Sequence, residues 1–347
     1  MTLPSLASPG NTIFLATRGS ALALVQANMV LTQCRTAFPA LAFELKIIKT
    51  TGDKLQTAPP DVPGMAGTKG LFTKELEVAL LNGEADLAVH SLKDLPTDLP
   101  AGLELSAVLP RADVRDVFIY RDANSLGASG GEAVKRGLAP GAGLIDLPVG
   151  ATVATSSTRR QAQVLAVRPD LKVIPIRGNV GTRLQKLIDR AELDALILAA
   201  AGLLRLGFQV TPEGALIAPK NARGKDHAPE GLRATFLGVE EMIPCVGQGA
   251  IGIEGRSGDV RLAPIFAELN HPATLSCVTA ERAFLRGMGG GCLSPVAGYA
   301  ELADDQLSMR AVSFQQVPVR RAHRQGPIGE AVELGARVAA ELKGGLN

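Results

Sequence analysis

The stretch IFLATRGS at residues 13–20 decides the fold of this chain. Its first five residues are apolar or small and predict a buried strand, and the polar turn Arg18-Gly19-Ser20 leads into a helix. The helix is expected to end near Thr36, because Pro39 cannot continue it. The run FELKII at 43–48 then predicts a second strand. Strand, arginine turn, helix and strand together form one α/β unit.

This unit occurs twice in the chain. The stretch TVATSSTRR at residues 152–160 repeats the strand and its arginine turn, and KVIPI at 172–176 repeats the second strand. The next helix and strand are duplicated too, at 72–80 and 86–90 and again at 180–188 and 194–198. Strands that alternate with helices favour right-handed crossovers and mainly parallel sheets. Two such α/β units in tandem place a ligand cleft between them, near the carboxyl ends of the strands.

The last quarter of the chain has a different pattern. It predicts a helix at 273–286, a hairpin of two strands at 296–300 and 307–312 around Asp304-Asp305, and a final helix at 328–342. We therefore expect a small C-terminal α+β domain after the two α/β domains.

The expected domains have the following limits. Domain 1 comprises 1–113 with 250–267, domain 2 comprises 119–243, and domain 3 comprises 272–347. Two stretches rich in glycine or proline, 124–150 and 212–230, are interpreted as surface insertions rather than core. The stretch Gly247-Gln248-Gly249-Ala250 lacks a dinucleotide fingerprint and predicts a tight backbone crossing between domains.

Composition excludes several classes of protein. The 347 residues carry a net charge of +2, and only 3% are aromatic, so the chain has no overall attraction to nucleic acid and few stacking platforms. The longest uncharged apolar run, 195–204, is far shorter than the ~20 residues that cross a bilayer. The four cysteines show no C-x-x-C pair, and the N-terminus shows no signal peptide. These features indicate a soluble protein of the reducing cytoplasm without a zinc site.

Cations gather where strands end. Any one of them could be a solvated surface side chain, but their recurrence at corresponding turns of a duplicated fold indicates an anion-binding cleft. No phosphate-binding motif accompanies them, so carboxylates are at least as good a ligand. The basic residues in these turns are Arg18, Lys69, Lys93, Arg159, Arg160, Arg177 and Arg183.

Two further residues carry chemistry. Asp94, in the stretch HSLKDLP at 90–96, would lie inside this cationic cleft. It either caps a helix or pairs with Lys93, or it is an anion held ready for a cation that develops during reaction. Cys292 follows a glycine arm at 287–291, and alone it could be a packed turn residue. If its sulfur is functional, it is an attachment point or a nucleophile.

These motifs together resemble the porphobilinogen deaminase (hydroxymethylbilane synthase) family, in the family's order and over about 12–295. The matching segments are 16–24, 69–77, 90–96, 155–161, 177–183, 201–207, 246–250 and 290–292. The resemblance implies two domains like those of periplasmic binding proteins and a third that carries the cofactor cysteine. It also implies a monomer.

The resemblance further implies a transferase of haem and tetrapyrrole biosynthesis. A dipyrromethane cofactor would be joined to Cys292 as a thioether. Four porphobilinogen molecules would then be added head to tail, each with loss of ammonia, and hydrolysis would release the linear tetrapyrrole hydroxymethylbilane. No metal is implied.

The resemblance also assigns roles to residues. Asp94 would stabilise the cation left by ammonia and the pyrrole N–H groups. Lys69 and Phe72 would belong to a lid at 51–70 and just beyond, in which Met65 stands where the family often has a second lysine. The residues that would hold cofactor or substrate carboxylates are Arg18, Ser20, Lys93, Ser157, Arg159, Arg160, Arg177, Arg183 and Arg205.

Two rival hypotheses use the same residues. An anion receptor of the periplasmic type would share the fold and the cationic cleft but catalyse nothing; the missing signal peptide and the Cys292 arm count against it. A cysteine acyltransferase would need a base beside the thiol. None of the four histidines, His90, His227, His271 and His323, lies in a motif that suggests one, and His90 is interpreted as a packing or hydrogen-bonding residue.

Overall fold

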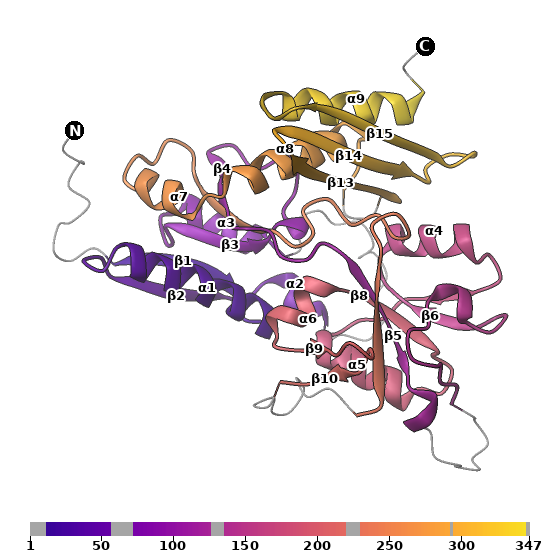
Figure 1. Cartoon of the computed structure of the whole chain (residues 1–347). Coiled ribbons are helices and arrows are strands. Elements are labelled where there is room, and N and C mark those ends of the chain that lie inside the picture. Colours follow the sequence, from indigo (N-terminus) through magenta and orange to yellow (C-terminus); the bar gives the residue numbers. More distant parts are fainter. Residues whose placement is uncertain (1–11, 57–71, 126–134, 220–229, 292–293, 345–347) are drawn as a thin grey trace.

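The computed structural model describes residues 12–56, 72–125, 135–219, 230–291 and 294–344. These residues form three main sheets, each with its own apolar core, and one small two-stranded sheet. In Figure 1 the first sheet lies at the left, the second at the lower right and the third at the top. None of the helices in the described ranges has the length and apolar composition that a bilayer crossing requires.

The first sheet has the strand order β2-β1-β3-β12-β4, and helices cover both of its faces. Alternate residues of β1 explain the two faces: Leu15 belongs to the core under α1 and α7, whereas Ala16 packs under α3 with Leu76 and Leu80. The strands are β1 (Ile13–Arg18), β2 (Phe43–Ile48), β3 (Leu87–Ser91), β4 (Leu103–Val108) and β12 (Ile251–Arg256). The helices are α1 (Ala21–Ala37), α2 (Thr51–Gln56), α3 (Lys74–Leu81) and α7 (Ala263–Leu269).

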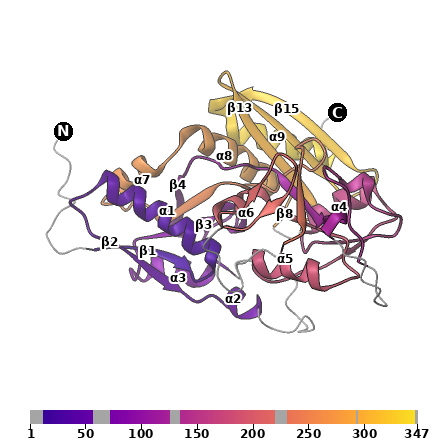
Figure 2. The same cartoon turned by 60° about the horizontal axis from the view of Figure 1, so that its bottom comes forward.

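The second sheet repeats this plan with the order β11-β5-β8-β6-β7. Its strands are β5 (Asp116–Arg121), β6 (Thr152–Ala154), β7 (Lys172–Ile174), β8 (Ala195–Ala199) and β11 (Leu232–Leu237). Its helices are α4 (Thr158–Val167), α5 (Val180–Asp189) and α6 (Ala200–Arg205), and a small hairpin pairs β9 (Gln209–Val210) with β10 (Leu216–Ile217). Figure 2 shows α6 next to α1 of the first sheet, where Gly202 approaches Leu22. The duplicated α/β fold expected from the sequence is confirmed.

Both sheets are mixed. In the first, β1 runs parallel to β2 and β3, whereas β12 is antiparallel to β3 and β4. In the second, β6 is parallel to β7 and β8, whereas β5 is antiparallel to β8 and β11. The predicted parallel pairing is therefore found in part of each sheet, among β1, β2 and β3 and among β6, β7 and β8. The rest of each sheet is antiparallel because β5 arrives from the first sheet and β12 returns from the second.

The two connections between the sheets cross closely. Gly249 has φ +83°, and a Cβ on it would lie 2.5 Å from the carbonyl oxygen of Ala112. The same two residues pair through the Ala112 N–H, which donates to the Gly249 carbonyl at 3.0 Å. The predicted backbone crossing at 247–250 is thus confirmed, and only glycine fits its geometry.

The third sheet is the antiparallel meander β13 (Val296–Ala303), β14 (Gln306–Ser313) and β15 (Arg320–Pro327). Helices α8 (Pro272–Gly287) and α9 (Ala331–Lys343) pack against it and against each other. The predicted hairpin turn is confirmed: Asp304 and Asp305 have φ 48° and 60°, as a two-residue primed turn requires. The sequence did not predict β15, because only Ala322 and Gly326 of its eight residues are buried.

The interpretation of the two insertions as surface is wrong for part of each. Leu144 and Leu147 are 2% and 4% exposed and pack in the core of the second sheet. The Arg168 guanidinium donates to the carbonyl oxygens of both leucines. Leu216 of β10 is also buried. These apolar residues stand between glycines, prolines and aspartates with no strand or helix period, so the pattern did not mark them as core.

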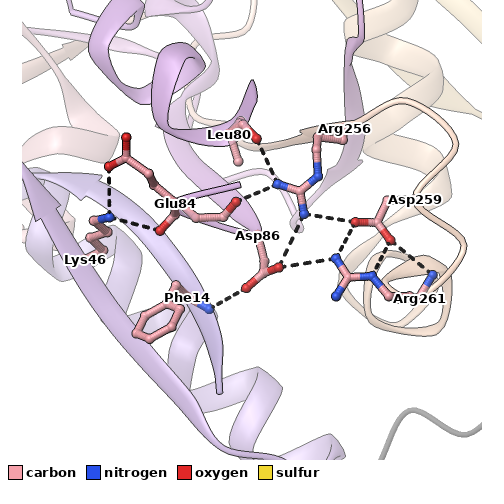
Figure 3. A network of polar contacts seen from close by, with 9 residues as sticks. Phe14, Lys46, Leu80, Glu84, Asp86, Arg256, Asp259 and Arg261 are labelled. Atoms are coloured by element: carbon pink, nitrogen blue, oxygen red, sulfur yellow. Dashed lines mark hydrogen bonds and ion pairs between the residues drawn. The ribbon is translucent and has the colours of Figure 1, made fainter. Parts of the chain in front are cut away.

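A polar network closes the end of the first sheet where β3 begins (Figure 3). Asp86 accepts a hydrogen bond from the Phe14 N–H at 3.0 Å and lies 3.3 Å from the Arg256 guanidinium. Arg256 also donates to the carbonyl oxygens of Leu80 and Ala85. These bonds tie β1, β12 and the end of α3 to the start of β3. The opposite end of β3 is thereby left for the site described below.

The close packing of α9 on α8 yields a prediction. A Cβ on Gly335 of α9 would lie 2.1 Å from the Ala280 carbonyl oxygen of α8 and 2.8 Å from the Phe284 nitrogen. Gly335→Ala should therefore force the helices apart and destabilise the protein by about 2–3 kcal/mol. Gly329→Ala is the matched control, because no atom lies within 4 Å of its added Cβ. Thermal unfolding should show a lower midpoint for the first variant alone; equal midpoints would contradict the prediction.

Candidate active site

A cavity of about 300 Å³ lies between the first and second sheets, at the carboxyl ends of β1, β3 and β8. Its position follows from topology, because parallel strands of one sheet end at the same edge. Among the described residues, four cations and one carboxylate line it: Arg18, Lys93, Arg160, Arg183 and Asp94. Ser20, Gln26, Phe72, Thr73, His90, Ser91 and Asn179 are among the other lining residues.

Arg18 is the last residue of β1 and is held from two sides. Its guanidinium lies 2.5 Å from Asp53 of α2, and its Cζ lies 4.1 Å from the centroid of the Phe72 ring. Burial raises the pKa of Asp53, but hydrogen bonds from Arg18 and Thr50 outweigh it and leave that pKa below its ordinary value. Ser20 follows as the N-cap of α1 and accepts from the Ala23 N–H at 3.3 Å. The side chain of Arg18 is therefore fixed before any ligand arrives.

Asp94 and Lys93 lie on a short 3-10 helix, Leu92–Asp94, directly after β3. Gly247, on the connection that returns from the second sheet, packs against this 3-10 helix. A Cβ on Gly247 would lie 3.2 Å from the backbone nitrogen of Lys93. Burial lowers the pKa of the Lys93 ammonium, and the nearby Arg160 lowers it further, while Asp94 and Asp116 oppose these effects. The lysine and the carboxylate thus face the cavity side by side.

A buried carboxylate, Asp116, orders the next two arginines. Its Oδ1 accepts from Arg160 at 2.7 Å, its Oδ2 accepts from Arg159 at 2.9 Å, and Gln248 donates to Oδ1 at 2.7 Å. Burial raises the pKa of Asp116, but the two guanidiniums dominate and hold it far below its ordinary value. The Arg159 guanidinium donates to Asp116 and to the Ile243 carbonyl, and the residue does not line the cavity. Arg160 does line it.

The remaining predicted residues lie around the same edge of the second sheet. Arg183 of α5 lines the cavity and donates to the Gly178 carbonyl at 2.7 Å; burial lowers its pKa to about 10, so it stays charged at neutral pH. Ser157 caps α4 and is absent from the cavity lining. Arg177 is exposed, and Arg205 donates to the Gly249 carbonyl at 2.7 Å; neither lines the cavity.

Two predicted residues, Lys69 and Cys292, lie outside the described residues. The start of the glycine arm is described: α8 ends at Gly287, and Gly289 has φ +68°, a left-handed conformation that suits a helix end. The Gly290 N–H donates to the Leu285 carbonyl, so the chain turns sharply out of the helix before Cys292.

Sequence reasoning missed three residues at the site. Asp53 and Asp116 supply the partners of the cavity arginines, and Gln26 accepts from the Ser91 hydroxyl at 2.9 Å while its own Nε2 has no hydrogen-bond partner among the described residues. Asp53 lies in the first turn of α2, close after β2, but it is not one of the cations that marked such turns, and neither Gln26 nor Asp116 lies in a turn of this kind. Asp116 follows Arg115 and opens the strand DVFIYR, whose next four residues are apolar or aromatic, and a carboxylate in that position could have been singled out as a buried ion-pair partner.

The fold and the cavity define a class: a two-lobed α/β protein with a site for a polyanion between its lobes. Residues 13–264 match the family described as "Porphobilinogen deaminase, dipyromethane cofactor binding domain", and residues 275–344 match "Porphobilinogen deaminase, C-terminal domain". The chain belongs to the porphobilinogen deaminase family. The resemblance inferred from the sequence is confirmed.

Individual relatives agree. The chain is 43% identical over 333 residues to a porphobilinogen deaminase of Desulforudis audaxviator (strain MP104C), which covers 95% of this chain and 94% of that protein. It is 42% identical over 331 residues to one of Geobacter metallireducens (strain ATCC 53774 / DSM 7210 / GS-15), covering 94% and 90%. Among solved structures, the Corynebacterium glutamicum OxyR C206 mutant is 14% identical over 81% of this chain and 68% of that one; its TM-score of 0.39 supports no argument.

The activity follows from the family. The chain is a transferase of tetrapyrrole biosynthesis that polymerises porphobilinogen on a dipyrromethane cofactor. The rival hypotheses of a receptor without catalysis and of an acyltransferase are set aside, because relatives similar over nearly the whole chain are porphobilinogen deaminases.

The cavity fits this cofactor. Each pyrrole unit brings two carboxylates, and in the part of the chain that the structure describes the cavity lining holds four cations and one carboxylate. The Arg160 Nε is buried without a hydrogen-bond partner among the described residues, so the guanidinium has a donor left for a ligand. Among the described residues, no group of three or more His, Cys, Asp and Glu side chains is arranged to hold a metal ion.

The Asp116 cluster yields a prediction about stability. Asp116→Asn leaves two buried guanidiniums without their counter-charge and should destabilise the protein by about 3–5 kcal/mol. Because the folded-state pKa of Asp116 is depressed, its stabilisation is complete above the unfolded pKa of about 3.9 and is lost as the pH falls below it. The difference in thermal unfolding between the two proteins should therefore be widest at neutral pH, narrow as the pH falls below about 3.9, and close only at the much lower pH at which Asp116 is protonated in the folded protein.

Glu192→Gln is the control for this experiment, because its ion pair with Arg190 is a surface contact with side chains 58% and 42% exposed. That variant should unfold at nearly the wild-type temperature over the same pH range. A difference between wild type and Asp116→Asn that stays constant down to pH 3 would show that the carboxylate charge is not what stabilises the cluster.

Proposed function

We propose that Asp94 is the catalytic carboxylate of this polymerisation. The observation that carries the proposal is its place: among the described residues that line the cavity, it is the one carboxylate, and it stands among four cations. Positive charge develops on the methylene carbon of porphobilinogen as ammonia leaves. An ionised carboxylate fixed in a site of low dielectric stabilises such a charge without reorganising. The same oxygens can accept hydrogen bonds from pyrrole N–H groups.

For the cations we propose the binding of carboxylate side chains. Arg18, Arg160 and Arg183 line the cavity, and the guanidinium fork suits a carboxylate bidentately. Lys93 would add a point charge beside Asp94. Ser20, Ser157, Arg177 and Arg205 remain proposed cofactor or substrate contacts from the resemblance. Arg159 remains with them, and its bonds support a role through Asp116 and Arg160.

The dipyrromethane, when bound through Cys292, supplies the pyrrole carbon to which the first substrate is joined. The residues of the chain then act on each new unit in the same way. The arginines orient its carboxylates, Phe72 and Lys69 would close over it, and Asp94 stabilises the methylene cation. The proton released when the new carbon–carbon bond forms leaves with ammonia as ammonium, so charge balances at every addition.

We also propose the larger organisation of the molecule. Domain 1 would comprise 1–113 with 250–267, domain 2 would comprise 119–243, and domain 3 would comprise 272–347. The separate apolar cores of the three sheets support this division. The enzyme would act as a monomer in the cytoplasm.

The tether yields a direct prediction. Intact-mass measurement of the purified protein should show the chain mass plus two linked pyrrole units. Cys292→Ala should show the bare chain mass, since no thioether can form, and should not turn over porphobilinogen. A wild-type protein with the bare mass and no activity after prolonged incubation with porphobilinogen would contradict the proposal.

The role of Asp94 yields a second prediction. Asp94→Ala should fold and carry the cofactor by intact mass, yet its turnover should fall by about 10²-fold or more, as when a charge-stabilising group is removed. Asp98→Asn is the control, because this carboxylate lies in the same loop but is 71% exposed at the surface. Near-normal turnover of Asp94→Ala would remove Asp94 from the catalytic role.

A further inference from the structure

The loop that carries Asp94 is held by a side chain from another part of the molecule. We define the Asp94 loop as residues 92–99. Arg282 of α8 donates to three successive carbonyl oxygens of this loop, those of Leu95 at 3.2 Å, Pro96 at 2.7 Å and Thr97 at 3.2 Å. One guanidinium thus fixes the backbone immediately after the proposed catalytic carboxylate.

Arg282 makes these bonds from a buried position. The residue is 9% exposed, so its hydrogen bonds replace water that it cannot reach. Its neighbour one turn on, Arg286, also contacts the loop at the Thr97 carbonyl and Asp98, but the side chains of that ion pair are 55% and 71% exposed. Both arginines therefore bond to the Asp94 loop, Arg282 from a buried position and Arg286 from the surface.

Apolar packing joins the same two elements. Leu92 and Leu95 of the Asp94 loop lie in one buried cluster with Val278 of α8, and Leu275 of α8 packs against it. Packed cores resist small displacements. The loop is therefore held to α8 by hydrophobic contacts on both sides of Asp94 and by the polar clamp that follows it.

The opposite contacts of α8 are equally rigid. Glu281, the residue before Arg282, is 0% exposed and pairs with Arg111 at 2.7 Å, on the segment that leaves the first sheet. Gly335 of α9 packs directly on the backbone of α8. The helix ends at Gly287, five residues before Cys292 in the sequence. A fixed helix thus lies between the Asp94 loop and the start of the cysteine arm.

We propose that Arg282 is a positioning residue, which holds the Asp94 loop at a fixed position relative to α8, the helix that leads to the cofactor cysteine. The proposal rests on the catalytic role assigned to Asp94 above. Arg282 is absent from the cavity lining. Its effect on the reaction passes through the backbone at Leu95, Pro96 and Thr97.

Loss of the Arg282 contacts should affect the chemical step rather than substrate binding. The cavity arginines Arg18, Arg160 and Arg183 belong to other elements, so the carboxylate contacts proposed for them do not depend on Arg282. A displaced Asp94 would leave those contacts to the substrate in place, but it would stabilise the developing cation poorly. Loss of the clamp should therefore lower kcat and leave KM nearly unchanged.

The test compares Arg282→Lys and Arg282→Gln with Arg286→Gln. Lysine keeps the charge and the aliphatic stem but cannot bind three carbonyls in a planar fork. We expect Arg282→Lys to carry the full cofactor by intact mass, with kcat lower by about tenfold or more and KM within about twofold. Arg286→Gln should match wild type in both constants. Wild-type kcat for both Arg282 variants, or equal losses for Arg282→Lys and Arg286→Gln, would overturn the proposal.

A double-mutant cycle separates this inference from the proposed function. Arg282→Lys should lower single-turnover rates in the wild-type background and not in the Asp94→Asn background, because the clamp acts through the carboxylate. Equal losses in both backgrounds would overturn the positioning role and leave the role of Asp94 standing. Normal turnover of Asp94→Asn itself would overturn the proposed function first.

Amide hydrogen exchange gives a readout that does not depend on activity. The amides of residues 92–99 should exchange faster in Arg282→Lys than in wild type, while those of α8 stay protected. Unchanged exchange in the Asp94 loop would overturn the clamp even if catalysis were impaired.

Discussion

The arrangement of the three sheets depends on one buried carboxylate, Glu281 of α8. Its Oε1 accepts from Arg111 and from the Ala300 N–H, and its Oε2 accepts from Arg111 and from the Gly247 N–H. Arg111 lies on the segment that leaves the first sheet, Gly247 on the segment that returns from the second, and Ala300 in the third. A carboxylate that water cannot reach must have its oxygens satisfied by the protein. The three parts of the chain therefore meet at this side chain with little freedom.

A second buried carboxylate, Asp116, fixes arginine side chains at the cavity. Its ion pairs with Arg159 and Arg160, and that of Asp53 with Arg18, fix the guanidiniums at the edges of both sheets. The chain can therefore be nearly neutral overall and still present a strongly cationic cavity. Prior fixation also lowers the entropy that a flexible arginine would lose on binding, so a carboxylate ligand meets groups that are already oriented. These fixed cations line the same cavity as Asp94.

Local signals predicted the elements well where the pattern was periodic. The strand at 43–48 is observed with the same limits, and the predicted helix at 273–286 differs by one residue at each end. Prediction failed where burial did not follow a period. β15 is mostly exposed because α9 covers only part of it, and Leu144 is buried because Arg168 satisfies the carbonyls of an irregular loop. Such burial depends on partners distant in the sequence, which no local pattern can reveal.

The residue order alone was enough to establish the duplicated α/β plan, the family and the collection of cations and Asp94 at strand ends. It was enough because strand-to-helix turns in such folds converge on one edge of each sheet. The three-dimensional structure decided which of those cations face the cavity: Arg160 does, whereas its neighbour Arg159 turns to Asp116 and Ile243. It also revealed Arg282, which is 187 residues from Leu95 along the chain. Contacts over that separation exist only once packing has brought α8 against the first sheet.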